Sequence, residues 1–166
     1  MRARHARTAA SGPERQAGGA EAFASPACYS LPLPPSANRL FKQVGRRRVK
    51  SQVYVDWQGH AAWVLRSQKP EPVHGRYLLM IAVERPTADS DIDNRIKALS
   101  DLLVREGVTG DDSLMVGLCI AWSPPSSGLA RVAILPAGNY AFKFHLSQDG
   151  ASGGFFLAPQ PQQEAA

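Results

Sequence analysis

The chain has 166 residues, of which 44% are hydrophobic, and its formal net charge is +5 at pH 7. This length allows one domain, and the hydrophobic content is ordinary for a folded protein. No window approaches the roughly 20 apolar residues of a membrane span, and the basic N-terminus lacks the apolar run of a secretory signal, so we expect a cytoplasmic protein. Cys28 and Cys119 are too few for a disulfide framework or a zinc site, and we expect reduced thiols.

The positive charge is concentrated in the first 50 residues. These hold ten Lys or Arg residues and two acidic ones, a net charge of +8, which leaves −3 for the rest of the chain. The densest basic group of the expected folded region consists of Arg46, Arg47, Arg48 and Lys50. A polyanion is the natural partner of this basic N-terminal part of the chain, and a metal cation is the natural partner of the acidic middle segment.

The first part of the chain predicts a disordered extension, an extended segment and one helix. Residues 1–27 are rich in Ala, Gly and Arg with little to bury, so we expect a disordered basic N-terminal extension. The acidic Glu14 and Glu21 argue against an organellar transit peptide. The prolines within 31–35 favour extended backbone that enters a loop, and they exclude a central strand.

Ser51 is a suitable N-cap for a helix over 52–67, where apolar residues recur at helical spacing. For the next helix, the cap is Asp93 or Asn94 and the stop is Gly107. The elements that we expect after the first helix are a buried strand at 76–83, a helix at 95–105, strands at 114–122 and 131–135 with a turn at 123–128 between them, and an edge strand at 140–146.

These elements predict a single small α/β or α+β domain, in which a mixed sheet is packed with two main helices. The domain would span residues 28–136. Residues 137–166 would then form the edge strand and, beyond Gln148, a low-complexity C-terminal tail.

The acidic residues of the middle segment predict a metal site. Asp91 and Asp93 are two apart, so on extended backbone their carboxylates share a face. We expect the following helix and its turn to bring Asp112 back to the same place. Magnesium prefers a few carboxylates together with waters and phosphate oxygens, which favours phosphodiester chemistry. An EF-hand is excluded, since its sixth position is Asn94 instead of Gly and its twelfth is Ser100 instead of Glu.

The neighbouring polar residues have two interpretations each. Lys97 is one helical turn from Asp93, so it contacts the transition state or forms an ordinary helix ion pair with Asp93 or Asp101. Asp111 is either a hydrogen-bonding partner of Asp112 or a turn residue. We expect Asn94 to be structural, capping the helix and tightening the turn. Asp101 and Glu106 are expected to be solvated.

Several motifs together resemble the RusA family of Holliday junction resolvases. They are L-P-L-P-P-S-A-N-R-L, the helix with Tyr54 and Trp57, D-I-D-N-R-I-K-A-L-S-D-L-L, and G-V-T-G-D-D-S, within about residues 29–135. The resemblance implies a homodimeric, Mg²⁺-dependent nuclease, with Mn²⁺ as a possible substitute, that acts on four-way junction DNA. It also implies three metal-binding catalytic aspartates, Asp91, Asp93 and Asp112, assisted by Lys97.

We expect Arg46, Arg47, Arg48 and Lys50 to bind DNA phosphates, which gives affinity independent of base sequence. Asn38 and Arg39 approach DNA or only shape their loop. Among the aromatic residues, packing is favoured over base stacking for Tyr54, Trp57 and Trp63. Two alternative functions remain: a metal-dependent nucleotide phosphohydrolase, and a junction-binding protein that does not cleave.

Overall fold

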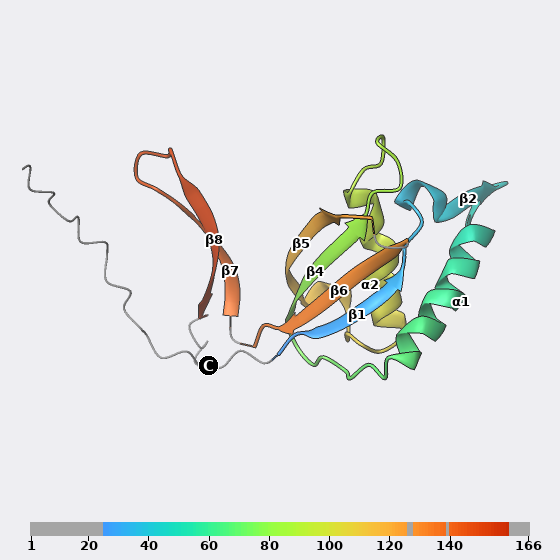
Figure 1. Cartoon of the computed structure of the whole chain (residues 1–166), viewed down its shortest axis with the longest axis horizontal. Coiled ribbons are helices and arrows are strands. Elements are labelled where there is room, and N and C mark those ends of the chain that lie inside the picture. The colour runs from blue at the N-terminus through green and yellow to red at the C-terminus, as the bar shows by residue number, and fades with distance from the viewer. Residues whose placement is uncertain (1–24, 126–127, 139, 160–166) are drawn as a thin grey trace, which may run out of the picture.

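A four-stranded mixed sheet forms the centre of the protein in the computed structural model, which describes residues 25–125, 128–138 and 140–159 (Figure 1). β4 lies inside the sheet, antiparallel to β6 and parallel to β5, and β1 pairs with the other side of β6. The strands of this sheet, in their spatial order, are β1 (Ala27–Pro32), β6 (Leu129–Pro136), β4 (Tyr77–Glu84) and β5 (Met115–Ser123).

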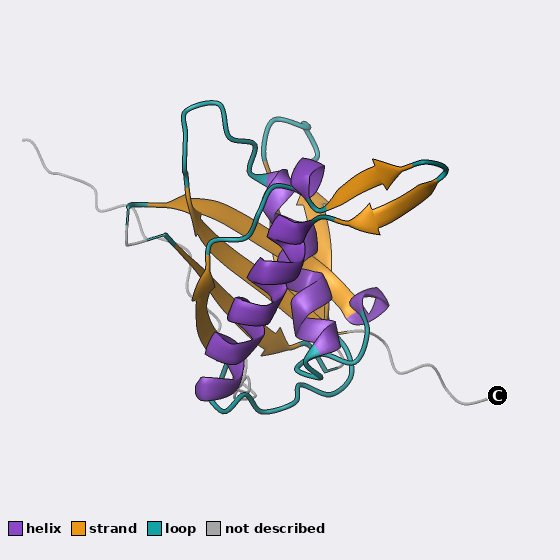
Figure 2. Ribbon diagram, turned by 90° about the vertical axis from the view of Figure 1, so that its right-hand side faces the viewer, coloured by secondary structure: helices purple, strands orange, loops and turns teal. Residues whose placement is uncertain are grey.

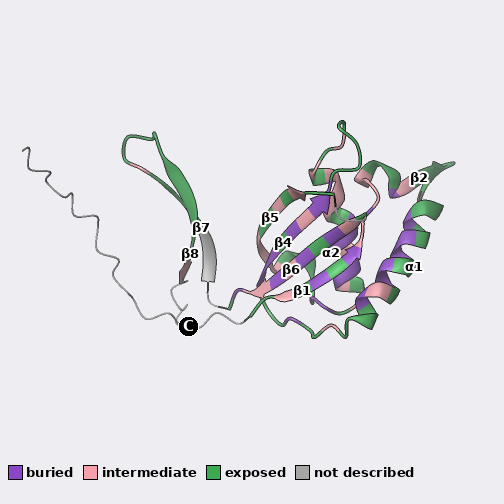
Figure 3. Ribbon diagram, viewed as in Figure 1, coloured by how far each residue is buried: buried purple, intermediate pink, exposed green. Residues whose placement is uncertain are grey.

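Two helices, α1 (Gln52–Ser67) and α2 (Ile96–Arg105), lie against one face of this sheet (Figure 2). Alternate residues of β4 point to that face, and Leu79, Ile81 and Val83 are buried there. Burial is greatest where the helices meet the sheet (Figure 3). The predicted fold class, a single small mixed α/β domain with two main helices, is therefore confirmed.

The first helix has the predicted bounds and the predicted cap. The backbone N–H of Tyr54 donates to Ser51 Oγ over 3.2 Å, and this hydroxyl in turn donates to the carbonyl oxygen of Arg39 over 2.5 Å. Ser51 therefore caps α1 and also fastens it to the short helical turn η1 (Ala37–Arg39).

The second helix begins differently from the prediction and ends as predicted. A 3₁₀ turn, η2 (Asp93–Arg95), leads into α2, and neither Asp93 nor Asn94 provides a side-chain cap. Both residues lie inside the 3₁₀ turn, where Asp93 Oδ1 accepts the backbone N–H of the next residue, Asn94, and no side chain caps α2 itself. Gly107 has φ 72°, a conformation that glycine adopts without steric cost, and it ends the helix.

One hairpin and one further strand lie outside the predicted elements. β2 (Phe41–Val44) and β3 (Arg47–Lys50) form a hairpin turning at Gly45, which the run of basic residues conceals because it shows no apolar alternation. We call residues 41–50 the basic hairpin. The predicted strand at 140–146 is present as β7 (Tyr140–Leu146), but its partner β8 (Gly153–Pro159) replaces the predicted tail beyond Gln148. Composition is a poor guide here, since pairing with β7 orders a Gly-Gly segment.

Most of the predicted N-terminal extension, residues 1–24, lies outside the part of the chain that the structure describes. The first strand, β1, begins at Ala27. Cys28 and Cys119 are both exposed free thiols. Within the described part of the chain, no helix has the length and apolar character needed to cross a membrane.

We predict that Ser51→Ala lowers the free energy of unfolding by about 1 kcal/mol, because the Tyr54 N–H loses its acceptor and η1 loses its contact with α1. Urea unfolding followed by circular dichroism measures the loss. The control is Ser67→Ala at the other end of α1, where the exposed hydroxyl donates only to the Val64 carbonyl. Equal effects of the two substitutions would contradict the capping role.

Candidate active site

Asp91 and Asp93, which we call the acid pair, lie in the connection between β4 and α2. Both side chains are exposed. The prediction that they stand on extended backbone is wrong, because the intervening Ile92 has helical angles, φ −72° and ψ −39°, and Asp93 begins η2. On such a turn, alternation along a strand does not decide which side chains share a face.

Asn94 brings the two carboxylates together. Its side-chain Nδ2 donates to Asp91 Oδ2 over 3.1 Å, and its backbone N–H donates to Asp93 Oδ1 over 2.9 Å. The predicted role of Asn94 in tightening this turn is thus observed. Within the described residues, no donor contacts the second oxygen of either carboxylate, so each has one oxygen free to bind a ligand.

Asp112 does not join the acid pair within one chain. Because β5 runs parallel to β4, with Met115 opposite Tyr77, Asp112 lies at the start of β4, whereas the acid pair follows its end. Burial raises the pKa of Tyr77, the first residue of β4, and the negative charge of Asp112 adds to that shift. β4 has eight residues, so its two ends are about 23 Å apart.

The expected convergence of three aspartates in a single chain is therefore not observed. Among the described residues, which include all three aspartates, no group of three or more His, Cys, Asp or Glu side chains can hold one metal ion. The physical reason is the path of α2. This helix of ten residues, about 15 Å long, returns the chain to the opposite end of the sheet. Whether the three residues are catalytic stays a prediction.

Asp112 instead lines a hollow of about 300 Å³ between the basic hairpin, α1 and the last turns of α2, together with Lys50, Asp101 and Arg105. Its neighbour Asp111 makes the contact of a turn residue, and its second interpretation, as a hydrogen-bonding partner of Asp112, stays a prediction. Asp111 Oδ1 accepts the backbone N–H of Ser113 over 2.8 Å, and the hydrogen bonds from Ser113 lower the pKa of Asp111.

Lys97 forms the ordinary helix ion pair in this structure. Its Nζ lies 3.0 Å from Asp101 Oδ1, while the hydroxyl of the buried Tyr54 donates to Asp101 Oδ2 over 3.1 Å. The side chain of Lys97 is 56% exposed, so it is free to turn toward a ligand.

The prediction that Glu106 is solvated is wrong, since its side chain is 4% exposed, whereas Asp101 is partly exposed at 28%. Asp101 binds Lys97 and Tyr54, and the nearly buried carboxylate of Glu106 pairs with Arg66 and Arg105. The partners of these acids lie far from them in the sequence, except Lys97 and Arg105, so a local pattern does not reveal them.

Arg95 is a site residue that the sequence analysis missed. Its guanidinium donates to the Pro34 carbonyl over 2.6 Å, which ties η2 to the proline-rich segment. Burial lowers the pKa of Arg95, and the positive charge of Arg39 lowers it further. The signal in the sequence was its position directly after the acid pair and Asn94, where a cation has an evident electrostatic role.

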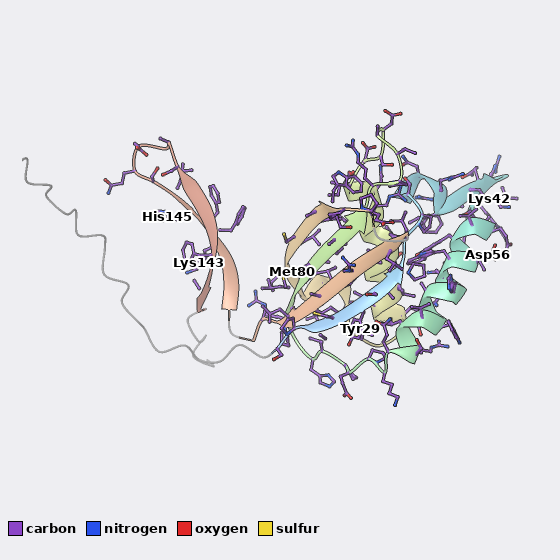
Figure 4. The ribbon with its side chains drawn as sticks, viewed as in Figure 1. Tyr29, Lys42, Asp56, Met80, Lys143 and His145 are labelled. Atoms are coloured by element: carbon purple, nitrogen blue, oxygen red, sulfur yellow. The ribbon has the colours of Figure 1, made fainter. Side chains whose placement is uncertain are left out.

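Some cations of the basic hairpin contact other side chains, and others have no protein partner within the described residues. Arg48 stacks over the Phe41 ring at 4.5 Å, and Lys50 donates to Gln58 Oε1 over 2.9 Å. The exposed side chains of Arg46 and Arg47 have no protein partner within the described residues. In Figure 4, Lys42 projects from the same hairpin beside the first turns of α1.

The remaining predicted DNA contacts lie on the surface, whereas the aromatic residues differ in how far they are buried. Asn38 and Arg39 form the exposed end of η1, which packs beside η2 and therefore beside the acid pair. Packing is confirmed for Tyr54 and Trp57, which are buried, and Tyr54 lies edge-on to Phe41. Trp63 is 69% exposed and contributes little to the core.

Comparison with known proteins gives two matches. The model of the family described as "Endodeoxyribonuclease RusA" matches residues 32–134. A protein named "Crossover junction endodeoxyribonuclease RusA" from Aquifex aeolicus (strain VF5) is 32% identical over 87 residues, which cover 51% of this chain and 68% of that protein. The family match includes the acid pair, Asp112 and the basic hairpin, and it ends before β7.

We predict that Tyr54→Phe makes stability less sensitive to alkaline pH. Burial raises the pKa of Tyr54 above its ordinary value of 10.0, and the charge of Asp101 raises it further. Above pH 10 the folded state then binds more protons than the unfolded state. The free energy of unfolding therefore falls as the pH rises, by up to about 1.4 kcal/mol per pH unit for one group.

Urea unfolding of wild type and variant at several pH values between about 8 and 11 tests this sign. The wild-type free energy of unfolding minus that of the variant should decrease as the pH rises above 10. A difference that is constant with pH would contradict the raised pKa of Tyr54.

Proposed function

This chain belongs to the RusA family and is a crossover junction endodeoxyribonuclease, and from that premise we propose that it resolves Holliday junctions in DNA recombination and repair by paired, symmetric, magnesium-dependent nicks. The observation that carries the proposal is the acid pair, two exposed carboxylates joined through Asn94 inside the region that matches the family. Exposed hard oxygen ligands beside a basic surface suit a metal ion shared with a phosphodiester.

The donor set fits magnesium. Each carboxylate of the acid pair keeps one free oxygen, and Mg²⁺ takes one or two carboxylates while waters and substrate phosphate oxygens fill its other positions. Asp91 and Asp93 would hold the ion, with Asp112 as a further ligand. When bound, the ion lowers the pKa of a water molecule and stabilises negative charge on the phosphoryl oxygens.

The residues of the chain supply the remaining parts of the reaction. Asn94 fixes the direction of both carboxylates, so the ligands are arranged before substrate binds. Lys97 can leave Asp101 at small cost, because an exposed helix ion pair contributes only about 0.3–0.5 kcal/mol. Its ammonium then places a positive charge against the phosphate in the transition state.

Asp112 reaches the acid pair most simply from a second copy of the chain. In a two-fold dimer, the end of the sheet that carries Asp112 on one protomer can meet the end that carries the acid pair on the other. Each protomer then contributes to both sites, and two identical sites match the two symmetric strands of a four-way junction. We propose this composite arrangement for the homodimer.

The sheet face opposite the helices offers a surface for a second copy. In Figure 4, Met80 lies on the side of the sheet away from α1, and its side chain is 38% exposed. Met80, Cys28 and Cys119 line a largely apolar hollow of about 340 Å³ on this face. The described part of the chain leaves this hollow open, as interaction surfaces commonly are in isolated subunits.

DNA recognition falls to the basic hairpin. Arg46 and Arg47 have no protein partner within the described residues, so they are available to phosphates. Contacts of this kind give affinity that depends on salt and not on base sequence, which suits recognition of a branched DNA by its shape.

We predict that Asp93→Asn abolishes cleavage of a synthetic four-way junction in Mg²⁺ while junction binding is retained, because the substitution removes a ligand charge and leaves the hairpin intact. Electrophoresis of the labelled junction measures both nicking and the mobility shift. The matched control is Asp89→Asn, an exposed aspartate in the same loop, which should nick like wild type. Wild-type shift without nicks would contradict the nuclease, and activity on small phosphate esters alone would favour a nucleotide phosphohydrolase.

A mixed dimer of Asp93→Asn and Asp112→Asn chains tests the composite site. If Asp112 acts in the partner's site, the mixed dimer keeps one intact site, and it should nick one strand although each parent homodimer is inactive. Differently tagged chains, co-expressed and purified through both tags, provide the sample. A mixed dimer of Asp91→Asn and Asp93→Asn has no intact site and is the control. An inactive Asp93→Asn, Asp112→Asn dimer would place all three ligands in one chain.

A further inference from the structure

A third hollow, of about 410 Å³, lies beside the acid pair, between the proline-rich segment, α1 and the loop after β4. Arg39 and Arg95 both line it, and so do the hydroxyl-bearing residues Thr87 and Ser90. Ser90 directly precedes Asp91. We call this the arginine hollow, and it is distinct from the hollow that Asp112 lines.

The two arginines of this hollow have no acidic partner. Neither forms an ion pair with a described residue. The cations that do form ion pairs within the described residues are Arg66, Lys97 and Arg105. Arg95 donates to one carbonyl oxygen, and its buried Nε has no hydrogen-bond partner within the described structure. Two guanidinium groups that share a partly buried hollow repel each other, and an anion between them would remove that repulsion and satisfy the free donors.

The position of the hollow suggests which anion. The acid pair would hold the metal-bound phosphate that is cut, and two residues that line the arginine hollow flank this pair in the sequence: Ser90 directly precedes Asp91, and Arg95 follows Asp93 by two residues. A DNA strand carries a phosphate at every nucleotide, so its neighbouring phosphate comes close to this hollow. One guanidinium group can donate two parallel hydrogen bonds to the oxygens of a phosphate. The hydroxyls of Thr87 and Ser90 are further polar groups that line the arginine hollow.

We propose that the arginine hollow binds a backbone phosphate adjacent to the scissile one, with Arg39 and Arg95 as joint ligands. This inference rests on the proposed nuclease function and adds a positioning site to it. The apolar walls, formed by Val53, Trp57 and Leu33, suit the sugar attached to that phosphate. A fixed adjacent phosphate sets the scissile bond in place over the acid pair.

The test measures how salt weakens junction binding in the Asp93→Asn background, where no cleavage interferes. One lost phosphate contact lowers the slope of log affinity against log salt by about 0.9. If both arginines hold one phosphate, Arg39→Gln, Arg95→Gln and the double variant should each lose about that amount, and the two single losses should not add. The control is Lys69→Gln, an exposed cation after the far end of α1, which should keep the wild-type slope.

Thermal stability separates a phosphate from a carboxylate of a partner protomer. Without DNA, Arg39→Gln should leave the melting temperature unchanged or raise it, because it removes repulsion with Arg95. A lower melting temperature that depends on protein concentration would mean that a partner's carboxylate fills the hollow, and it would overturn the proposal. A salt slope for Arg95→Gln equal to that of Lys69→Gln would overturn it as well.

The same variants in the chain with Asp93 intact distinguish this inference from the proposed function. Under single-turnover conditions with saturating protein, Arg95→Gln should nick the junction at least about tenfold more slowly, since the scissile phosphate is less well fixed. If wild type nicks and Arg95→Gln nicks equally fast, the arginine hollow has no role in positioning while the nuclease stands. If wild type does not nick, the nuclease fails, and the salt slopes still decide what the hollow binds.

Discussion

The parallel pairing of β4 with β5 is the constraint on which the rest of the site depends. A parallel pair needs a crossover that returns the chain to the starting edge, and α2 is that crossover. The acid pair precedes α2 and Asp112 follows it, so the helix separates them to opposite ends of the sheet. Among the described residues, both long helices lie on one face of the sheet. The homodimer that we propose would bring the acid pair of one protomer to Asp112 of the other.

The front segment of the chain is tied to this motif by polar contacts. Arg95 donates to Pro34, Ser51 donates to the Arg39 carbonyl, and the indole of Trp57 donates to Pro32 over 3.2 Å. Segments that are far apart in the sequence thereby form one wall around the acid pair. The proline-rich segment is suited to this role because proline has no N–H to donate to a neighbouring strand. The segment therefore leaves the sheet, and its carbonyl oxygens can accept hydrogen bonds from side chains.

Charge is divided across the molecule in a way that suits a nuclease. The acid pair is exposed, Arg39 and Arg95 line a hollow that also includes Ser90, the residue before Asp91, and the basic hairpin carries further exposed positive charge. Arg66 and Arg105, which pair with Glu106, lie at the C-terminal ends of α1 and α2 and stabilise the fold. Arg39, Arg95, Arg46 and Arg47 form no ion pair with a described residue. In the proposed complex, DNA phosphates would neutralise their charge.

The sequence by itself determined the local elements and the family. Helical spacing after Ser51, the apolar run of β4 and the stop at Gly107 are decided by residues close together in the chain, and these predictions agree with the structure. The D-x-D-N-x-x-K pattern likewise pointed to the acid pair, because residues on one turn are close together in the sequence. The basic hairpin and β8 depend on strand pairing, which composition concealed.

Only the tertiary structure decided where the distant groups lie. It separated Asp112 from the acid pair, joined Lys97 and Tyr54 through Asp101, and placed Arg39 and Arg95 in one hollow. Each of these follows from the direction in which strands pair and from the face on which helices pack. Those choices minimise the free energy of the whole core, so no short stretch of residues contains them.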